Sequence, residues 1–236
     1  MKNSTLENLL SEIGIEYRKE YLEKLERFYF LLTEKNRHMN LTAITEYDEF
    51  MRKHFADCLV VLKFQSFSAG QRILDLGTGG GFPGIPLKIF LPETEFVLMD
   101  SVRKKLVFLE DVINELALKN ISVVHGRAED LAHSGEYREQ FDLVLSRAVS
   151  NLSSLSELAL PFVKTGGRFI SYKGDNGKDE LLRADNAISV LGGRVEILNE
   201  YVLPGGDRRC LIFINKEKKC PMKYPRKAGT PTREPL

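Results

Sequence analysis

A glycine-rich loop directly after a short apolar segment is the feature that most constrains the fold of this chain. Residues 73–84 read ILDLGTGGGFPG, so four glycines fall within five positions. Glycine lets a backbone turn tightly and lets a ligand approach closely, because it has no Cβ. Such a loop between a strand and a helix is typical of cofactor cradles in α/β sheets. A turn that binds nothing is the weaker interpretation, because each glycine costs backbone entropy on folding.

The residues around these glycines distinguish between two cofactors. Asp75 precedes Gly77, Gly79 and Gly81, and this pattern is similar to that of S-adenosylmethionine (SAM) methyltransferases. A carboxylate here can accept a hydrogen bond, directly or through water, from the cationic methionine end of SAM, whereas it would repel a pyrophosphate. Residues 79–84 also fit the dinucleotide pattern G-x-G-x-x-G, but a proline in that stretch removes an amide donor that phosphate would need. We therefore favour SAM.

Length and composition limit the class of protein. With 236 residues, 43% of them hydrophobic and 28% charged, the chain suits one large α/β domain or a domain with a small appendage. The net charge of +1 does not by itself indicate a nucleic-acid partner. Cys58, Cys210 and Cys220 show neither metal-ligand spacing nor a disulfide framework, which favours reduced thiols in the cytoplasm and no metal site.

Neither a secretory signal nor a membrane segment is expected. The N-terminus leads into an amphipathic segment rather than an apolar signal core, and no apolar stretch is long enough to span a membrane. We expect a cytoplasmic monomer that does not bind a membrane.

Helical spacing dominates the first third of the chain. We predict one helix that begins at Ser4 or Thr5 and ends near Ile13, and a second over residues 21–35. Thr45 with Asp48 resembles a capping box before a third helix. Three segments are predicted: an N-terminal helical extension (1–69), a SAM-binding core (70–217) and a basic C-terminal arm (218–236).

Strands and helices alternate regularly in the core. The predicted strands are Arg72–Leu76, Glu95–Asp100, Ile121–His125, Phe141–Ser146, Gly167–Tyr172, Arg194–Leu203 and Arg208–Asn215, with helices near Pro83–Phe90, Arg103–Leu118, Ser153–Val163 and Asp179–Leu191. Strand–helix repeats imply a mainly parallel sheet with helices on both faces. The last two strands are joined only by residues 204–207, so they should form an antiparallel hairpin. This layout is that of an α/β, Rossmann-like class I SAM-dependent methyltransferase: seven strands, one of them antiparallel.

Residues at the ends of later strands extend the predicted cofactor site. Asp100 ends the second strand about 20 residues past the loop, where an acid can accept hydrogen bonds from ribose hydroxyls, and Ser101 follows it. A helix-capping role for Asp100 is the alternative. Ala128 and Glu129 follow the third strand, in the turn that lies beside adenine in class I enzymes. A charged surface turn is the alternative for that pair.

The end of the fourth strand should lie where substrate meets the methyl group. Arg147 stands there and indicates a contact to an anion or a carbonyl, with a surface salt bridge as the alternative. The chain lacks the Asn/Asp-Pro-Pro-aromatic motif of exocyclic-amine methyltransferases. It also lacks a cysteine preceded by proline or threonine, which enzymes that methylate C5 of pyrimidines need.

Motifs across nearly the whole chain resemble the bacterial small-subunit ribosomal RNA guanine-N7 methyltransferases, the RsmG (GidB) family. The matching stretches are Asn40–Thr42, Lys53–Cys58, Leu74–Leu87, Ala128–Glu129, Ser146–Ala148, Tyr172–Gly174 and Tyr224–Pro231. Within the third of these, FPGIP is more specific than the glycines. Lys227 and Ala228 depart mildly from the family pattern, which often has arginine and proline there.

The resemblance implies SAM-dependent methylation of a guanine N7 in the 530-loop region of 16S rRNA, in the decoding centre of the small subunit. It implies cofactor contacts from Gly77, the loop at Phe82, the Ala128–Glu129 turn and Arg147. The implied partner is 16S rRNA, the small subunit or an assembly intermediate. Guanine N7 carries an exposed lone pair, so an in-line transfer needs no general base, metal or covalent intermediate.

Polar residues that could hold the target guanine are Asn40, His54, Arg147 and Lys173, with Arg147 and Lys173 as positioning residues rather than certain catalytic ones. Guanine O6 and N7 are acceptors, so hydrogen-bond donors are needed near O6. Asp57 lies one helical turn after His54 and could orient its imidazole, although such pairs are more often structural.

The C-terminal arm concentrates positive charge. It carries +5 from residue 216 onward in a chain of net +1, and Arg208 and Arg209 lie on the neighbouring hairpin. We predict an extended arm in which Arg226 and Lys227 bind RNA phosphates, with a disordered solubilising tail as the alternative.

Three classes of function therefore remain: an rRNA methyltransferase, a small-molecule methyltransferase, and a dinucleotide-binding oxidoreductase or noncatalytic module. If the arm binds RNA, deletion of the residues after Asn215 should abolish RNA methylation and leave SAM binding intact.

Overall fold

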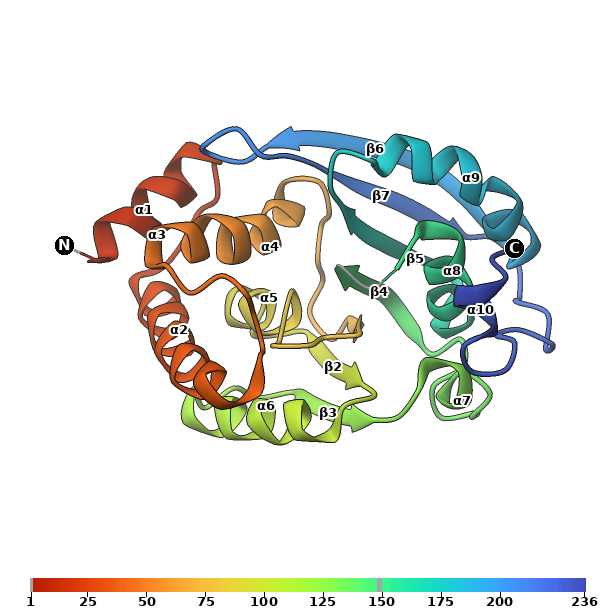
Figure 1. Cartoon of the computed structure of the whole chain (residues 1–236), viewed down its shortest axis with the longest axis horizontal. Coiled ribbons are helices and arrows are strands. Elements are labelled where there is room, and N and C mark those ends of the chain that lie inside the picture. The colour runs from red at the N-terminus through yellow and green to blue at the C-terminus, as the bar shows by residue number, and fades with distance from the viewer. Residues whose placement is uncertain (1, 148–149) are drawn as a thin grey trace.

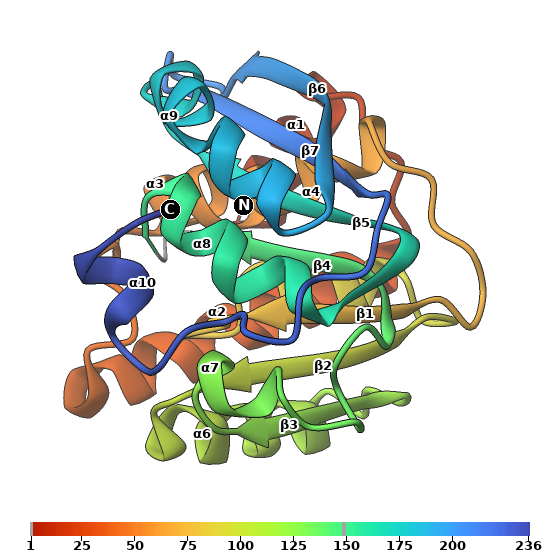
Figure 2. The ribbon, with the colours of Figure 1, turned by 90° about the vertical axis from the view of Figure 1, so that its right-hand side faces the viewer.

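Seven strands form one sheet in the order β3-β2-β1-β4-β5-β7-β6 (Figures 1 and 2). The structure, a computed structural model, describes residues 2–147 and 150–236. The strands are β1 (Arg72–Leu76), β2 (Glu95–Asp100), β3 (Ile121–His125), β4 (Phe141–Arg147), β5 (Val163–Lys173), β6 (Gly193–Val202) and β7 (Arg208–Lys216). Strands β1 to β5 pair in parallel, whereas β7 is antiparallel to both of its neighbours. The predicted class I architecture, including the final hairpin, is confirmed.

Helices connect the strands and precede the sheet. They are α1 (Lys2–Glu12), α2 (Lys19–Met39), α3 (Tyr47–Phe50), α4 (Asp57–Leu59), α5 (Gly84–Phe90), α6 (Arg103–Glu115), α7 (Ala128–Leu131), α8 (Leu152–Ala159), α9 (Gly177–Val190) and α10 (Thr230–Arg233). A π-helical segment over Met51–Ala56 joins α3 to α4, and 3₁₀ turns follow α4 and α8. In the described chain, no helix is long and apolar enough to cross a membrane.

Two hydrophobic clusters lie on opposite faces of the sheet. Side chains alternate between the two faces of a strand, and in β2 the residues Phe96 and Leu98 join one cluster while Val97 and Met99 join the other. The first cluster includes apolar side chains from α1, α2, α5 and α6. The second includes side chains from α8 and α9, which lie in front of the sheet in Figure 2. The strands are therefore buried on both faces, which explains their continuous apolar sequences.

The N-terminal helices share the first cluster with the sheet. Leu22, Leu25 and Phe28 of α2 are buried in the same cluster as Ile73 of β1 and Phe213 of β7. The boundaries at residues 69 and 217 stay predictions, and apolar packing continues across both of them.

Two local predictions were wrong. The N-cap of α3 is Glu46, whose carboxylate accepts hydrogen bonds from the backbone N of Asp48 and of Glu49, so Thr45 is not the cap. The predicted extended arm is instead folded onto the domain, because Cys220 and Tyr224 belong to the second hydrophobic cluster. Figure 2 shows this segment running past α8 to α10.

Candidate functional site

The carboxyl ends of the parallel strands meet at one edge of the sheet and gather the predicted cofactor residues. A cavity of 310 Å³ opens there; its walls include the predicted residues Gly77, Asp100, Ser101, Ala128 and Glu129. These residues come from the loops after β1, β2 and β3, so their common cavity follows from the parallel topology. Lys105 and Arg127 also line this cavity, and sequence reasoning missed both.

Asp100 joins the glycine loop to the start of α6. Its Oδ2 accepts a hydrogen bond from the backbone N of Gly79 at 2.9 Å, and its Oδ1 accepts one from Val102 N at 2.8 Å. The carboxylate is almost fully buried while the residue still lines the cavity. Asp100 therefore fixes the loop geometry and also lines the cavity. The alternative of a helix cap is wrong, because the N-cap of α6 is Val102 and, among the described residues, no side chain caps that helix.

The glycines of the loop have different roles. Gly77 and Gly79 are partly exposed, and each has a positive φ that favours glycine. A Cβ on Gly79 would meet only open space and one carbonyl oxygen 3.9 Å away, as expected beside a ligand. Gly81 is buried, and a Cβ there would lie 2.9 Å from both Ile85 and Leu109. Gly81 therefore has a packing role, and its cofactor contact stays a prediction.

Asp75 is fully buried beneath the loop. Its Oδ2 accepts hydrogen bonds from the Thr78 hydroxyl at 2.7 Å and from Gly84 N at 2.8 Å, so it joins the two ends of the loop. Its Oδ1 is buried and forms no hydrogen bond with any residue in the described part of the chain. Burial raises the pKa of Asp75 to about 7, even though these two hydrogen bonds oppose the rise. A cofactor contact by Asp75 stays a prediction, and Oδ1 is the oxygen left for it.

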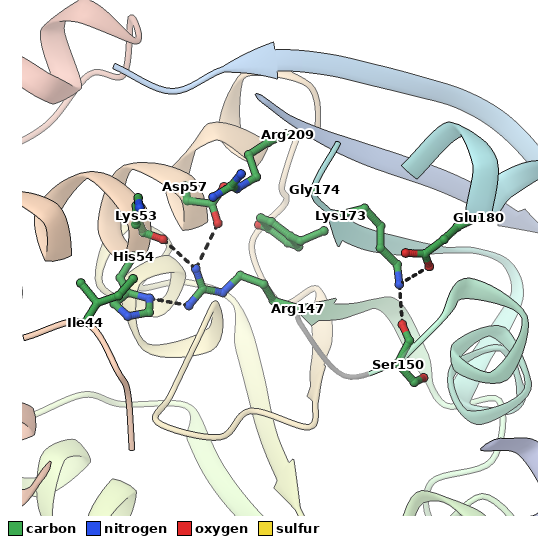
Figure 3. A pocket seen from close by; sticks show the side chains of 11 residues that line it. Ile44, Lys53, His54, Asp57, Arg147, Ser150, Lys173, Gly174, Glu180 and Arg209 are labelled. Carbon is green, nitrogen blue, oxygen red and sulfur yellow. Dashed lines mark hydrogen bonds and ion pairs between the residues drawn. The ribbon is translucent and has the colours of Figure 1, made fainter. Parts of the chain in front are cut away.

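A second, larger cavity of 570 Å³ lies beside β4 and the N-terminal helices (Figure 3). Residues from six parts of the chain line it: Ile44, Lys53, His54, Asp57, Arg147, Ser150, Tyr172, Lys173, Gly174, Glu180 and Arg209. The predicted positioning residues Arg147 and Lys173 are thus in the same cavity, together with His54 and Arg209. Ala148, which belongs to a stretch matched in the sequence, lies outside the described residues.

Arg147 is clamped at the centre of this cavity (Figure 3). Its Nη1 donates to the Lys53 carbonyl and to Asp57 Oδ2, both at 3.0 Å, and its Nη2 donates to His54 Nδ1 at 2.7 Å. The guanidinium also lies over the Phe82 ring, 5.1 Å from its centroid. A guanidinium has five N–H groups, and these contacts use three of them. Among the residues that the structure describes, none pairs with the Nε hydrogen or with the second Nη2 hydrogen, so both can serve a ligand.

The contacts of His54 fix its tautomer. Arginine can only donate, so Nδ1 of His54 carries the lone pair and Nε2 carries the proton, which it donates to Thr42 Oγ1 at 2.8 Å. Burial and the charge of Arg147 lower the pKa of His54 to about 3. The ring also stacks on Phe82 with centroids 4.6 Å apart. His54 is therefore a neutral side chain that orients Arg147.

Asp57 has a different role from the predicted one. Its carboxylate binds Arg147 through Oδ2 and accepts the Tyr201 hydroxyl at 2.8 Å through Oδ1, so it does not orient His54. Arg209 Nε lies 4.0 Å from the same Oδ1. Tyr201 was missed by sequence reasoning because it comes from β6, which is distant from Asp57 along the chain.

The remaining predicted RNA residues are scattered. The Lys173 ammonium is paired with Glu180 at 2.7 Å and donates to the Ser150 carbonyl. Asn40 is exposed at the end of α2 in a left-handed conformation, and Arg208 and Lys227 are exposed. None of these last three lines the larger cavity.

Arg226 is paired with a residue of the domain. Its guanidinium forms a bidentate ion pair with Glu157, with Nη2–Oε2 at 2.6 Å and Nε–Oε1 at 2.9 Å. The Glu157 side chain is fully buried. Arg226 therefore fastens the C-terminal segment to α8, and its contact to RNA phosphates stays a prediction. Sequence reasoning missed Glu157, which looks like an ordinary helix residue.

Several known proteins are similar to this chain over nearly its full length. A family model described as rRNA small subunit methyltransferase G (GidB) matches residues 21–209. A ribosomal RNA small subunit methyltransferase G from Lachnoclostridium phytofermentans is 49% identical over 235 residues, covering 99% of this chain and 97% of the relative. One from Thermoanaerobacter pseudethanolicus is 45% identical over 240 residues and covers both chains completely.

Solved structures agree on the fold. A SAM dependent methyltransferase from Aquifex aeolicus aligns with a TM-score of 0.53 at 17% identity, covering 74% of this chain and 96% of that chain. TrmN from Thermus thermophilus gives a TM-score of 0.52 at 19% identity, covering 67% and 48%. At such identities the likeness concerns the fold, whereas the near full-length sequence matches concern the family. The chain belongs to the rRNA small subunit methyltransferase G (GidB) family.

Proposed function

We propose that this protein transfers a methyl group from SAM to N7 of a guanine in the 530-loop region of 16S rRNA. Membership of the family supports methylation of small-subunit rRNA. The observation that carries the choice of N7 is the Arg147 clamp, in which the neighbouring His54 and Asp57 are engaged and unable to act as general bases. A cytoplasmic location and a monomeric state remain predictions from the sequence.

SAM is the cofactor of this methyltransferase, and the smaller cavity fits it. The open space beside Gly79 and the walls that include Asp100 and Glu129 suit a ligand with ribose hydroxyls and an adenine. We assign the ribose contact to Asp100 and the adenine contacts to Ala128 and Glu129. When bound, SAM supplies an electrophilic methyl group on a cationic sulfur.

The residues in the larger cavity suit a nucleophile that needs no deprotonation. His54 accepts a hydrogen bond from Arg147 through its lone pair, and its pKa of about 3 keeps it neutral. Cys58 is buried, and burial raises the pKa of its thiol to about 12, which disfavours a thiolate nucleophile. Guanine N7 attacks through an existing lone pair, so positioning is the main requirement.

The charges of the larger cavity suit an acceptor-rich base on a polyanion. Two N–H groups of Arg147 have no partner in residues 2–147 and 150–236, and these donors fit guanine O6, an acceptor on the same edge as N7. Lys53 and Arg209 also line the cavity and favour the approach of phosphate. We propose Arg147 as the residue that orients the guanine, with Lys173 and Glu180 holding one wall of the cavity.

Methyl transfer from labelled SAM to unmodified 16S rRNA and to small subunits tests this function directly. We expect one new 7-methylguanosine by nucleoside mass spectrometry, located in the 530 loop. Label on another nucleoside would contradict the choice of N7. Binding of SAM without label in either RNA substrate would favour a small-molecule substrate.

Asp100→Ala should weaken SAM binding by about 1–3 kcal/mol. The substitution removes the acceptor for Gly79 N and Val102 N, and it leaves the ribose hydroxyls unpaired. Isothermal calorimetry measures the effect. Asp111→Ala, at an exposed position on α6, is the matched control and should bind SAM as the wild type does. Equal affinities for the two variants would remove Asp100 from the cofactor site.

A further inference from the structure

The C-terminal segment over residues 217–236, here called the strap, crosses α7 and α8 (Figure 2). Its exposed residues include Lys218, Lys219 and Lys223, which explains its basic sequence. Its hydrogen bonds, however, point inward to the domain. The strap is therefore packed on the domain, which its charge does not indicate.

One ion pair fastens the middle of the strap. Arg226 binds both oxygens of Glu157, and its backbone N donates to Glu157 Oε1 at 2.7 Å. The same guanidinium donates to the Glu234 carbonyl at 2.7 Å, so it also closes the strap on itself. Because the Glu157 carboxylate is fully buried, removal of Arg226 would leave an uncompensated charge.

Other contacts fix the strap on either side of this pair. The guanidinium of Arg138 donates to the carbonyls of Cys220 and Tyr224, both at 2.9 Å. Ser154 Oγ donates to the Pro231 carbonyl at 2.7 Å. Tyr224 is only 6% exposed. These contacts hold one backbone path for the strap.

The strap reaches the cofactor cavity at Glu129. Gly229 N donates to Glu129 Oε1 at 3.0 Å, and Glu129 lines the cavity. Within the described chain, the other oxygen, Oε2, has no hydrogen-bond partner. Leu158, which follows Glu157 on α8, lines the same cavity. The strap thus connects two walls of the cavity, one from α7 and one from α8.

We propose that the strap positions the Glu129 carboxylate so that its free oxygen accepts a hydrogen bond from the amino group of adenine. An amino group is a donor and a carboxylate is an acceptor, so this contact selects adenine over bases that carry a carbonyl at that position. Arg226 is then a positioning residue that acts through Gly229 and Glu129. The inference rests on the proposed function, because it takes SAM as the ligand of this cavity.

The role of the strap changes what we expect for SAM binding after the C-terminal segment is lost. If the segment were an RNA arm, its loss would spare SAM binding. A strap that holds Glu129 gives the opposite result: the cofactor site weakens when the strap is released.

Binding of two ligands to the full-length protein tests the proposal. The ligands are S-adenosylhomocysteine and S-inosylhomocysteine, which has a carbonyl oxygen in place of the adenine amino group. We expect the wild type to prefer the adenosyl ligand by tenfold or more in calorimetry. Glu129→Gln keeps an acceptor for Gly229 N but can place an amide donor toward the adenine, so this preference should fall to about threefold or less.

Arg226→Ala should lose the preference in the same way, and the double variant with Glu129→Gln should show no additional loss. Arg226→Lys keeps a positive charge beside Glu157 but cannot form the bidentate ion pair. We expect this variant to lose part of the preference for the adenosyl ligand. If Arg226→Ala does not fold, the comparison is made with Arg226→Lys instead. Arg233→Ala, an exposed strap position, is the matched control and should retain the wild-type preference.

The outcomes separate this inference from the proposed function. A wild type that binds neither ligand would overturn the proposed cofactor site. A wild type that prefers the adenosyl ligand, together with Arg226 variants that retain this preference, would overturn the strap inference alone. Equal weakening of both ligands in the Arg226 variants would also overturn it, because a merely structural role predicts that result.

Discussion

The Arg147→Lys variant should methylate rRNA about a hundred- to a thousandfold more slowly than the wild type while remaining folded. Lysine can keep a positive charge near Asp57, but its single ammonium cannot reproduce the planar fork that contacts Lys53, Asp57 and His54 together. Loss of one preorganised donor at a reacting centre typically costs this much in kcat. Single-turnover methyl transfer under saturating SAM measures the change.

The alanine variant at the same position should also lose stability. Arg147→Ala leaves the Asp57 carboxylate, whose side chain is 6% exposed, without its ionic partner. The free energy of unfolding should fall by about 3 kcal/mol, toward the lower end for a broken buried pair because Tyr201 still donates to Asp57. Urea unfolding followed by circular dichroism gives this value.

A second paired arginine serves as the control for replacing arginine by lysine outside the larger cavity. Arg168 is paired with Glu196 on the same sheet but does not line the larger cavity, so Arg168→Lys should leave methyl transfer unchanged. A wild-type kcat in Arg147→Lys would show that the planar guanidinium of Arg147 is not needed for the reaction. A loss of the cooperative unfolding transition in that variant would assign Arg147 a structural role instead.

Stability should fall as the pH rises from about 4 to about 7, because Asp75 must lose a proton inside the protein. Its pKa rises from 3.8 to about 7 on folding, so between these values the folded state binds more protons than the unfolded state. The stabilising contribution is complete below pH 3.8 and is lost through pH 7. Each pKa unit corresponds to about 1.4 kcal/mol, so the total change is about 4 kcal/mol.

Urea unfolding at several pH values compares the wild type with Asp75→Asn. The asparagine does not titrate, so its stability curve should lack this fall, while other titrating groups affect both proteins equally. Asp185→Asn, at an exposed position on α9, is the control and should follow the wild type. Parallel curves for the wild type and Asp75→Asn would show that Asp75 is ionised throughout this range.

Sequence patterns predicted the sheet well because each strand carries its own signal. Strands β1, β2 and β3 begin and end where the sequence placed them, since glycine and polar residues bound short apolar runs. The helical segment that begins at residue 47 was harder to predict than the strands. It was predicted as one helix, but the structure has α3, a π-helical segment and α4, a difference of hydrogen-bond pattern that periodicity does not resolve.

The residues that line the smaller cavity could also be predicted from the sequence. Gly77, Asp100 and Glu129 follow successive parallel strands, and topology alone brings the carboxyl ends of such strands to one edge. The packing role of Gly81 was not predicted, because a glycine needed for close packing and a glycine needed for a ligand have the same local sequence.

By itself, the sequence determined the fold class, the loop and the edge of the sheet where the cavities lie, because propensity and periodicity are local properties of the chain. Only the tertiary structure decided the partners of the charged residues. Arg147 meets His54 and Asp57 across about 90 residues, and Arg226 meets Glu157 across 69. Whether an arginine is paired or free depends on such distant contacts, so the charge of the C-terminal segment predicted an RNA arm where the fold makes a strap.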